Sequence, residues 1–336
     1  MPNEIAELCL VHLPYPYHAL ARSVSSSWNR AITHPTFLLS KKSLSLSRPY
    51  LFVSAFHKST GRMQWQALDP SSGRWFVLPP TPNHVTPAAS ACASLPRHGK
   101  LFLIGATHPT FIYRTSTNQW SQSSPIPITA APSSLTAAEI NGQIITVGGT
   151  SVQSYDPETD TWEARGKIEE EEMEIGKSYD SAVVGGKLYV TEGWTWPFMF
   201  SPRGAVYDSE RERWGEMRRG MREGWTGVSA VVRGRVMVIS EYGDCPVKVY
   251  EEGGDRWEYV GGERFPREAL QRPLRVRGED EGGRIYVVSA KLNVGIGRVE
   301  IEERGGKERV KVKWEVLQAP KAFAEFSPSH CHLLYA

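Results

Sequence analysis

Apolar residues in the first 40 positions recur at the spacing of an α-helix. Ile5 and Leu8 are three positions apart, and Leu20, Val24 and Trp28 follow one another at steps of four. Prolines at positions 14, 16 and 35 interrupt this pattern and predict three separate short helices. Because about 40 residues cannot bury this much apolar surface alone, we expect the helices either to dock on the rest of the chain or to interleave with helices of a partner chain.

After a short polar seam the pattern changes, and from Tyr50 onward it is typical of β-strands. Runs such as Leu101–Ile104 and Ile144–Val147 are wholly apolar, which fits strands covered on both faces. A tight turn containing glycine precedes each of these runs. Before that turn lies a strand of small and β-branched residues, such as Leu135–Ile140. The pattern therefore predicts a series of similar antiparallel units.

Each unit ends in a hairpin with an aromatic signature. A tyrosine or leucine is followed seven residues later by tryptophan, and turn residues such as Asp156-Pro157 lie between them. This fixed spacing predicts that the two side chains face each other across the hairpin. The pairs are Leu68/Trp75, Tyr113/Trp120, Tyr155/Trp162, Tyr207/Trp214 and Tyr250/Trp257.

The spacing of the units predicts a closed ring. The tryptophans of the pairs, together with Trp314, are separated by 45, 42, 52, 43 and 57 residues, which is typical of a repeat architecture. The first unit begins at its second strand, Leu51–Ala55, and Ser329–Tyr335 has the pattern of the missing inner strand. We predict a mainly β fold, a six-bladed β-propeller closed by the C-terminal strand, with a small helical region before it. The predicted organisation is helices over 1–40, a linker over 41–49 and the propeller over 50–336.

The composition of the chain limits the partners and the cellular compartment that we expect for it. The formal net charge is only +2, so no overall field favours nucleic acid or an anionic membrane surface. No apolar run approaches the ~20 residues that span a bilayer, and the acidic residues and prolines near the start are unlike the apolar core of a signal peptide. The four scattered cysteines favour reduced thiols over a disulfide or zinc framework. We expect an intracellular protein of the nucleus, the cytoplasm or both.

Few residues of the sequence indicate a catalytic or metal-binding site. His330 and His332 share one face of a strand, as the first two ligands of a metal site would, but no third ligand is nearby and packing or hydrogen bonding is the better interpretation. The sequence contains no nucleophile-elbow or phosphate-loop motif. Acidic clusters at Glu169–Glu172 and Glu279–Glu281 fit solvated loops, with attraction to a basic partner or a cation as the alternative. We predict no catalytic residue, no metal and no cofactor.

One loop concentrates aromatic residues. Gly193–Arg203 joins the second and third strands of the predicted fourth blade, and Glu223–Thr226 is expected beside it on the same face of the disc. Exposed aromatic side chains near an arginine suit a protein partner. Alternatively, they fold back as a local core or plug the central channel. The predicted partner-binding residues are Trp194, Trp196, Phe198, Phe200, Arg203, Trp225 and Tyr242.

The N-terminal region resembles an F-box. The stretches Pro2–Leu8, Leu13-Pro14, Val24–Ile32 and Pro35–Leu38 match the motif, although Met1 stands where the family usually has leucine. The resemblance implies docking on a Skp-type adaptor and, through it, on a cullin scaffold. The adaptor-binding residues that it implies are Pro2, Ile5, Leu8, Leu10, Leu13, Pro14, Leu20, Val24 and Trp28.

The propeller units resemble kelch repeats, and Gly148-Gly149 keeps the double glycine of that family. At Trp194–Phe200, Gly224–Ser229 and Phe326–His332 the chain resembles plant F-box/kelch-repeat proteins. The resemblance implies the substrate-recognition subunit of an SCF-type cullin ubiquitin ligase, without catalytic groups of its own. Such a subunit would capture a target protein for ubiquitination in phytochrome-dependent red/far-red light signalling. The alternatives are a propeller enzyme, an oxidase or a lyase, and a kelch scaffold that binds its target without ubiquitination.

Overall fold

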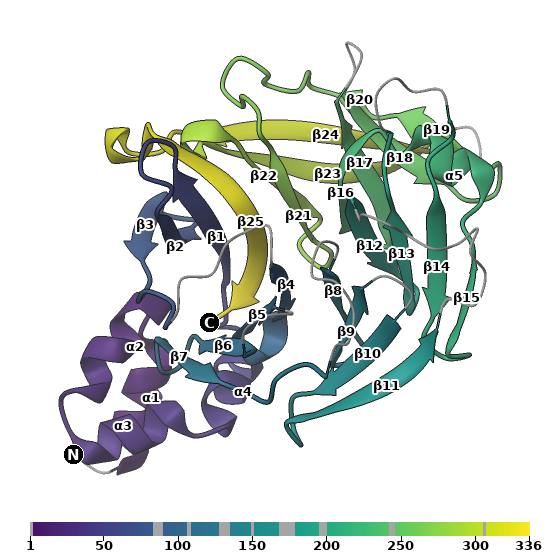
Figure 1. The fold of residues 1–336 in the computed structure, drawn as a ribbon. Helices are drawn as coiled ribbons and strands as arrows, with labels where there is room; N and C mark the ends of the chain where they lie inside the picture. The colour runs from purple at the N-terminus through teal and green to yellow at the C-terminus, as the bar shows by residue number, and fades with distance from the viewer. Residues whose placement is uncertain are drawn as a thin grey trace.

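The computed structural model shows a β-propeller of six blades, with a group of short N-terminal helices packed against one part of the ring (Figure 1). Five of the sheets have four strands and one has five. The prediction of a mainly β, six-bladed propeller is confirmed. The structure describes residues 3–82, 90–105, 109–127, 135–148, 151–167, 179–194, 200–241, 246–304 and 307–336.

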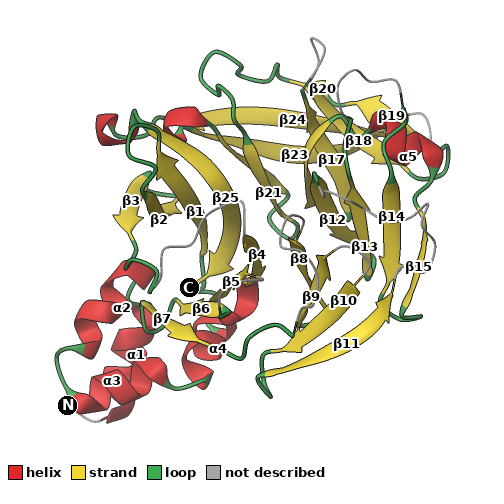
Figure 2. Ribbon diagram, viewed as in Figure 1, coloured by secondary structure: helices red, strands yellow, loops and turns green. Residues whose placement is uncertain are grey.

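Caps and turns divide the N-terminal region into four helices, drawn in red in Figure 2, where the sequence predicted three. Pro14 precedes the second helix, and Ser25 begins the third by accepting a hydrogen bond from the Trp28 amide at 3.2 Å. The steps of four from Leu20 to Trp28 therefore cross a helix boundary and do not form one stripe. The helices are α1 Asn3–His12, α2 Tyr15–Arg22, α3 Ser26–Thr33 and α4 Thr36–Ser43.

A buried polar contact holds α4 against the turn between α1 and α2. The Lys41 ammonium donates to the Leu13 carbonyl oxygen at 2.7 Å and lies 3.3 Å from His18 Nε2. Burial lowers the pKa of His18 to about 3, and the Lys41 charge acts in the same direction. Because this contact fixes the last turn of α4, the helix extends to Ser43, into the stretch for which the sequence suggested a linker.

Each blade is built on an antiparallel sheet whose innermost strand lines the channel. In four blades the strands follow chain order from the channel outward, because consecutive strands pair with each other. Blade 1 contains β25 Phe326–Tyr335, β1 Pro49–His57, β2 Met63–Asp69 and β3 Arg74–Val77; blade 2 contains β4 Ser90–Leu95, β5 Lys100–Gly105, β6 Phe111–Arg114 and β7 Gln119–Gln122; blade 3 contains β8 Leu135–Ile140, β9 Gln143–Gly148, β10 Ser151–Asp156 and β11 Thr161–Lys167.

The second half of the ring repeats this plan, and its last blade is the largest. Blade 4 contains β12 Asp180–Val184, β13 Lys187–Thr191, β14 Gly204–Asp208 and β15 Arg213–Glu216; blade 5 contains β16 Gly227–Val232, β17 Arg235–Ser240, β18 Val247–Glu251 and β19 Arg256–Tyr259; blade 6 contains β21 Arg275–Glu279, β22 Arg284–Val288, β23 Val294–Arg304, β24 Lys307–Leu317 and, parallel to it, β20 Gly261–Gly262. The helix α5 Arg219–Gly224 connects blades 4 and 5, and short 3-10 turns lie at Pro96–His98, Ala290–Leu292 and Lys321–Phe323.

The aromatic hairpins have the predicted register. All five pairs are direct cross-strand partners, and the four tyrosine–tryptophan pairs have ring centroids 5.0 to 5.4 Å apart. Five residues after each tyrosine or leucine lies a residue with positive φ, a regularity that the sequence analysis missed. These residues are Gly73, Asn118, Asp160, Glu212 and Asp255.

The C-terminal strand closes the ring, as predicted. β25 pairs antiparallel with β1 from Pro49 opposite Tyr335 to His57 opposite Phe326. The observed strand begins three residues before the predicted one because the pairing continues past a bulge next to Ser54. Residues from the two ends of the chain, among them Leu51 and Leu333, then share one buried cluster.

Candidate adaptor-docking and partner-binding faces

The N-terminal helices expose a group of apolar side chains. Ile5 and Leu8 of α1 are 51% and 53% exposed, Leu20 of α2 is 66% exposed, and Val24 in the following turn is 63% exposed. These four residues belong to the predicted adaptor-binding set. Exposed aliphatic side chains in such number indicate a surface that another protein covers.

Other members of the predicted set lie elsewhere. Leu10 is only 1% exposed and packs inside the helical group, so it supports this surface from below rather than contacting a partner. Leu13 and Trp28 are partly buried against the same core, and Pro14 is exposed at the start of α2. Pro2 lies outside the described residues. Tyr17, Leu39 and Leu44 of this region are also exposed, and the F-box motif did not point to them.

The opposite side of the helical group is fixed to the propeller. Tyr15 is buried, and its hydroxyl lies 2.5 Å from that of Tyr113 in blade 2. Its ring packs at 5.1 Å from Tyr50 and 5.6 Å from Phe52, within the core between blades 1 and 2. The helices therefore dock on the following domain with one side and leave another side free, so the two expectations from the sequence are compatible.

Two contacts show which face of the disc the helices occupy. Arg22 donates to the carbonyl oxygen of Thr117, in the turn between β6 and β7. Leu38 lies against Gly99, in the turn between β4 and β5, where a Cβ atom would come within 2.9 Å of the leucine methyl carbon and 2.2 Å of Thr115 Oγ1. We call the face that contains these hairpin turns the helix face. In a four-stranded blade, the connections after the second and fourth strands emerge on the other side, the loop face.

The loop face presents part of the predicted partner-binding set. Phe200 is 84% exposed, and Arg203 is exposed and paired with Glu192 at 3.1 Å. Trp194 is partly buried at the wall of the central cavity and donates its indole N–H to the Glu223 carbonyl oxygen at 2.8 Å. This bond joins the two loops that the sequence placed side by side. Trp196, Phe198 and Tyr242 lie outside the described residues.

Trp225 does not belong to a surface. It is 0% exposed, packs with residues of blades 4 and 5, and donates its indole N–H to Asp180 Oδ2 at 3.0 Å. The prediction that it contacts a partner directly disagrees with this burial. The reason is α5, which the sequence analysis did not identify: Gly224 at its end lies so close to Trp257 that a Cβ would be 2.0 Å from the ring, and the chain then turns Trp225 inward.

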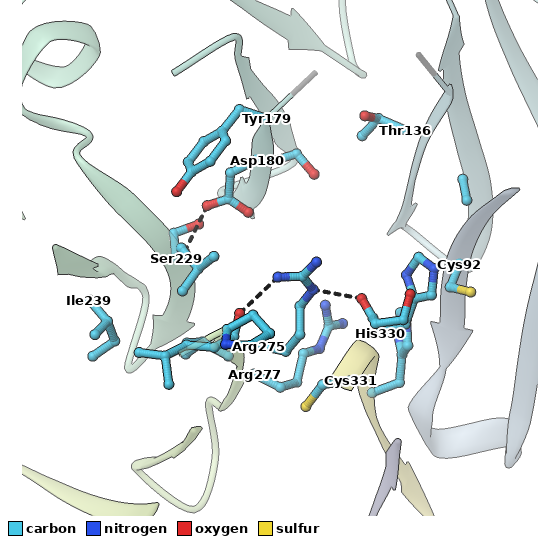
Figure 3. Close-up of a pocket in the computed structure, with 18 of the residues that line it drawn as sticks. Cys92, Thr136, Tyr179, Asp180, Ser229, Ile239, Arg275, Arg277, His330 and Cys331 are labelled. Carbon is cyan, nitrogen blue, oxygen red and sulfur yellow. Dashed lines mark hydrogen bonds between the residues drawn. The ribbon is translucent and has the colours of Figure 1, made fainter. Parts of the chain in front are cut away.

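A cavity of about 1120 Å³ occupies the centre of the ring (Figure 3). Inner strands of several blades line it, including β12, β16, β21 and β25. On one wall, Asp180 accepts hydrogen bonds from Trp225 and from the Ser229 amide at 2.7 Å, and burial raises the pKa of its carboxyl group to about 6. On another wall lie Arg275 and Arg277 together with His330.

The histidines of β25 lie at the wall of the cavity. Within the described part of the chain, no three histidine, cysteine, aspartate or glutamate side chains gather as metal ligands would. Burial lowers the pKa of His330 to about 4, with the Arg275 charge acting in the same direction, so the imidazole is neutral at pH 7. Cys92 and Cys331 are free buried thiols, and burial raises the pKa of both well above that of an exposed thiol.

The ring of kelch-like blades and the docked helices with an exposed apolar side define a class, the F-box proteins with a kelch propeller. Residues 1–40 match the F-box domain family. The chain is 51% identical over its full length to the F-box protein AFR of Arabidopsis thaliana, covering 91% of that protein, and 33% identical to the F-box/kelch-repeat protein At1g30090 of the same plant, covering 86% of it. The chain belongs to the F-box/kelch-repeat proteins, and the resemblance seen in the sequence is confirmed.

Membership of this family indicates a partner of the N-terminal helices. An F-box domain implies binding to a Skp-type adaptor in an SCF complex, which supports the role of a substrate adaptor for this chain. The F-box/kelch relatives suggest a subunit that works by binding rather than by catalysis. Among the described residues, no helix is both long and apolar enough to cross a membrane.

Proposed function

We propose that this chain is the substrate-recognition subunit of an SCF-type cullin ubiquitin ligase in the nucleus, the cytoplasm or both. The exposed apolar side chains of α1 and α2 dock on a Skp-type adaptor, and the loop face of the propeller captures a target protein. Ubiquitin transfer is then the work of a conjugating enzyme elsewhere in the assembly, and this chain supplies proximity, which raises the effective concentration of the target's lysines.

The observation that supports this proposal best is the opposition of the two faces. The helices contact the propeller at the hairpin turns that contain Gly99 and Thr117, whereas Trp194 and Phe200 belong to the connections on the other side. A target on the loop face and an adaptor on the helices therefore do not compete for space. The buried contact of Tyr15 with Tyr113 holds the two regions in one orientation.

The signalling context is a separate part of the proposal. The resemblance to a relative named AFR supports a role in phytochrome-dependent red/far-red light signalling. A propeller enzyme, whether oxidase or lyase, is the less favoured candidate, because the F-box/kelch relatives suggest a binding subunit and the described residues hold no cluster of metal ligands.

The test of adaptor docking uses charged substitutions on the exposed side of the helices. We expect Leu8→Asp and Leu20→Asp each to weaken co-purification with a Skp-type adaptor by roughly 100-fold, because an unpaired carboxylate in an apolar interface costs several kcal/mol. Both side chains are more than half exposed, so the thermal unfolding midpoint should stay within about 2 °C of the parent chain.

The matched control is Tyr259→Asp, which places the same charge at an exposed apolar position of blade 5. It should bind the adaptor normally. Adaptor binding unaffected by both leucine substitutions would reject the ligase proposal. For the loop face, Phe200→Asp should reduce the recovery of target proteins on the Leu8→Asp chain, which retains its target but cannot deliver it to a ligase.

A further inference from the structure

Three arginines of blade 6 face the central cavity without a carboxylate partner. Arg275 donates from Nε to the Ser329 carbonyl oxygen at 2.6 Å and from Nη1 to the Leu274 carbonyl oxygen at 2.8 Å. Arg272 donates to a carbonyl oxygen at 3.3 Å, and Arg277 forms no hydrogen bond with another described residue. Across the described part of the chain, none of the three takes part in an ion pair. Arg272 is exposed and Arg275 and Arg277 are partly buried, so their charges lie at the cavity wall with no carboxylate beside them, and an anion is favoured here.

The acidic residues around the same cavity do not neutralise these arginines. The Asp180 carboxylate accepts from Trp225 and from Ser229 N, and the Glu241 carboxylate accepts from the Tyr179 hydroxyl at 2.7 Å. Glu192 pairs with Arg203. Glu139, which acts on the pKa of Arg277 from a distance, accepts from the Gly142 amide at 2.8 Å. The cavity thus has an acidic wall whose groups are bonded and a basic wall whose charges are unmatched.

Two imidazoles extend the basic wall. His330 and His332 lie on β25, the inner strand next to β21, and both line the cavity. His332 is only 7% exposed, and its Nδ1, like Nε2 of His330, has no hydrogen-bond partner among the described residues. Both nitrogens are shielded from the cavity, so only the other nitrogen of each ring can reach a group bound there. Burial lowers the pKa of His332 well below its ordinary value, and the Arg277 charge acts in the same direction.

We propose that the central cavity binds a carboxylate between Arg275, Arg277 and the imidazoles of His330 and His332. A guanidinium is planar and presents parallel N–H donors that match a carboxylate, and a neutral imidazole adds one further N–H. Asp180 and Glu241 line the same cavity and repel negative charge from their own wall, so we expect the carboxylate on the side of Arg275 and Arg277. The volume of about 1120 Å³ accommodates several side chains of a peptide or a small organic acid.

The carboxylate has two possible sources with the same chemistry. One is an acidic segment of the target, entering from the loop face beside Trp194; this version rests on the proposed function. The other is a free organic acid, which would make recognition dependent on a metabolite. Both require the basic wall, and the binding measurement does not involve the F-box helices.

The experiment is calorimetric titration of the full chain, without adaptor, at low ionic strength. The probes are a nine-residue peptide of alternating glutamate and glycine, the same peptide with glutamine in place of glutamate, citrate, and inorganic phosphate; both peptides are acetylated and amidated at their ends. We expect the glutamate peptide, citrate or both to bind, the glutamine peptide not to bind, and Arg277→Gln to weaken binding by about tenfold or more. Arg277→Lys keeps the charge and should lose less than Arg277→Gln.

The control is Arg309→Gln, which removes the same charge from an exposed position on the outer strand of the same blade and should bind normally. Arg272→Gln, exposed at the cavity mouth and expected to fold, should weaken binding a few-fold, and it keeps the test valid if Arg277→Gln does not fold. Binding of the peptide alone assigns the target as the source, and binding of citrate alone assigns a free acid. Binding of phosphate without either carboxylate, no binding by any probe, or equal affinity in Arg277→Gln and Arg309→Gln would overturn the proposal. Because adaptor binding is measured separately, failure of one proposal leaves the other intact.

Discussion

At the scale of single residues, the tryptophans outside the repeat occupy two different environments. Trp194 stands at the cavity wall with part of its surface free, whereas Trp225 is enclosed between blades 4 and 5. The indole of Trp225 touches Trp257 at 6.1 Å between ring centroids and bonds to the buried Asp180. Trp225 therefore shapes the cavity indirectly, by holding the carboxylate of its acidic wall in place.

The first residue-scale prediction follows from that burial. Trp225→Ala should lower the free energy of unfolding by about 3–5 kcal/mol, because it leaves a cavity and removes a hydrogen bond from Asp180. Urea unfolding followed by circular dichroism measures this. Trp194→Ala, at the partly open position, is the matched control and should cost less than half as much. Equal and small effects for the two would contradict the buried placement.

The residues selected from the F-box resemblance differ in their exposure to solvent. Ile5, Leu8 and Leu20 were selected from the F-box resemblance, and the structure leaves them exposed. Leu10, selected with them, is buried because α3 and α4 pack on that side of α1. A helical pattern alone cannot distinguish two apolar sides when one faces a core and the other a partner.

At the scale of elements, the outer hairpins of blades 3 and 5 also connect to the segment that precedes their own blade. Asp255 lies in the left-handed conformation, with a φ of 49°, five residues after Tyr250, and accepts that tyrosine's hydroxyl at 2.7 Å. Its carboxylate also accepts the amides of Gly220 and Met221 in α5, at 2.9 and 3.0 Å. Asp160 makes equivalent bonds in blade 3, to Tyr155 and to the preceding connection.

The element-scale prediction concerns this aspartate. Asp255→Ala should destabilise the chain by about 2–4 kcal/mol, because three donors lose their acceptor and alanine tolerates positive φ poorly. Asp255→Asn keeps one acceptor oxygen and a residue type that adopts this conformation readily, so it should cost clearly less. Chemical denaturation of the two variants measures their loss of stability. An identical loss of unfolding free energy in both would show that the bonds to α5 contribute little.

At the scale of the whole molecule, ring closure joins the two ends of the chain. β25 contributes the innermost strand of blade 1, and the backbone of Ala336 exchanges hydrogen bonds with Arg48 just before β1. The same strand supplies His330 and His332 to the cavity. Closure therefore stabilises the ring and completes the basic wall at once.

The whole-molecule prediction is a truncation after Glu325, which removes β25. The remaining chain should lose its cooperative unfolding transition at 25 °C, because the inner edge of β1 and the apolar cluster around Leu51 become exposed. Tryptophan fluorescence during urea titration reports the transition. A peptide of residues 326–336 added in trans should restore it, whereas the same peptide with Leu333→Asp should not. A truncated chain that unfolds as cooperatively as the parent would show that closure is dispensable.

The sequence by itself determined the repeating unit: the period of the blades, the tyrosine–tryptophan register and the closure by the C-terminal strand. These follow from alternation and turn chemistry, which act between residues close in the chain or in adjacent strands. Only the tertiary structure decided that Trp225 faces inward, that the helices sit opposite the loop face, and that Arg277 and His332 line the same cavity. Burial and charge at those positions depend on neighbouring residues from other blades. A short-range sequence pattern does not show which distant residues become these neighbours.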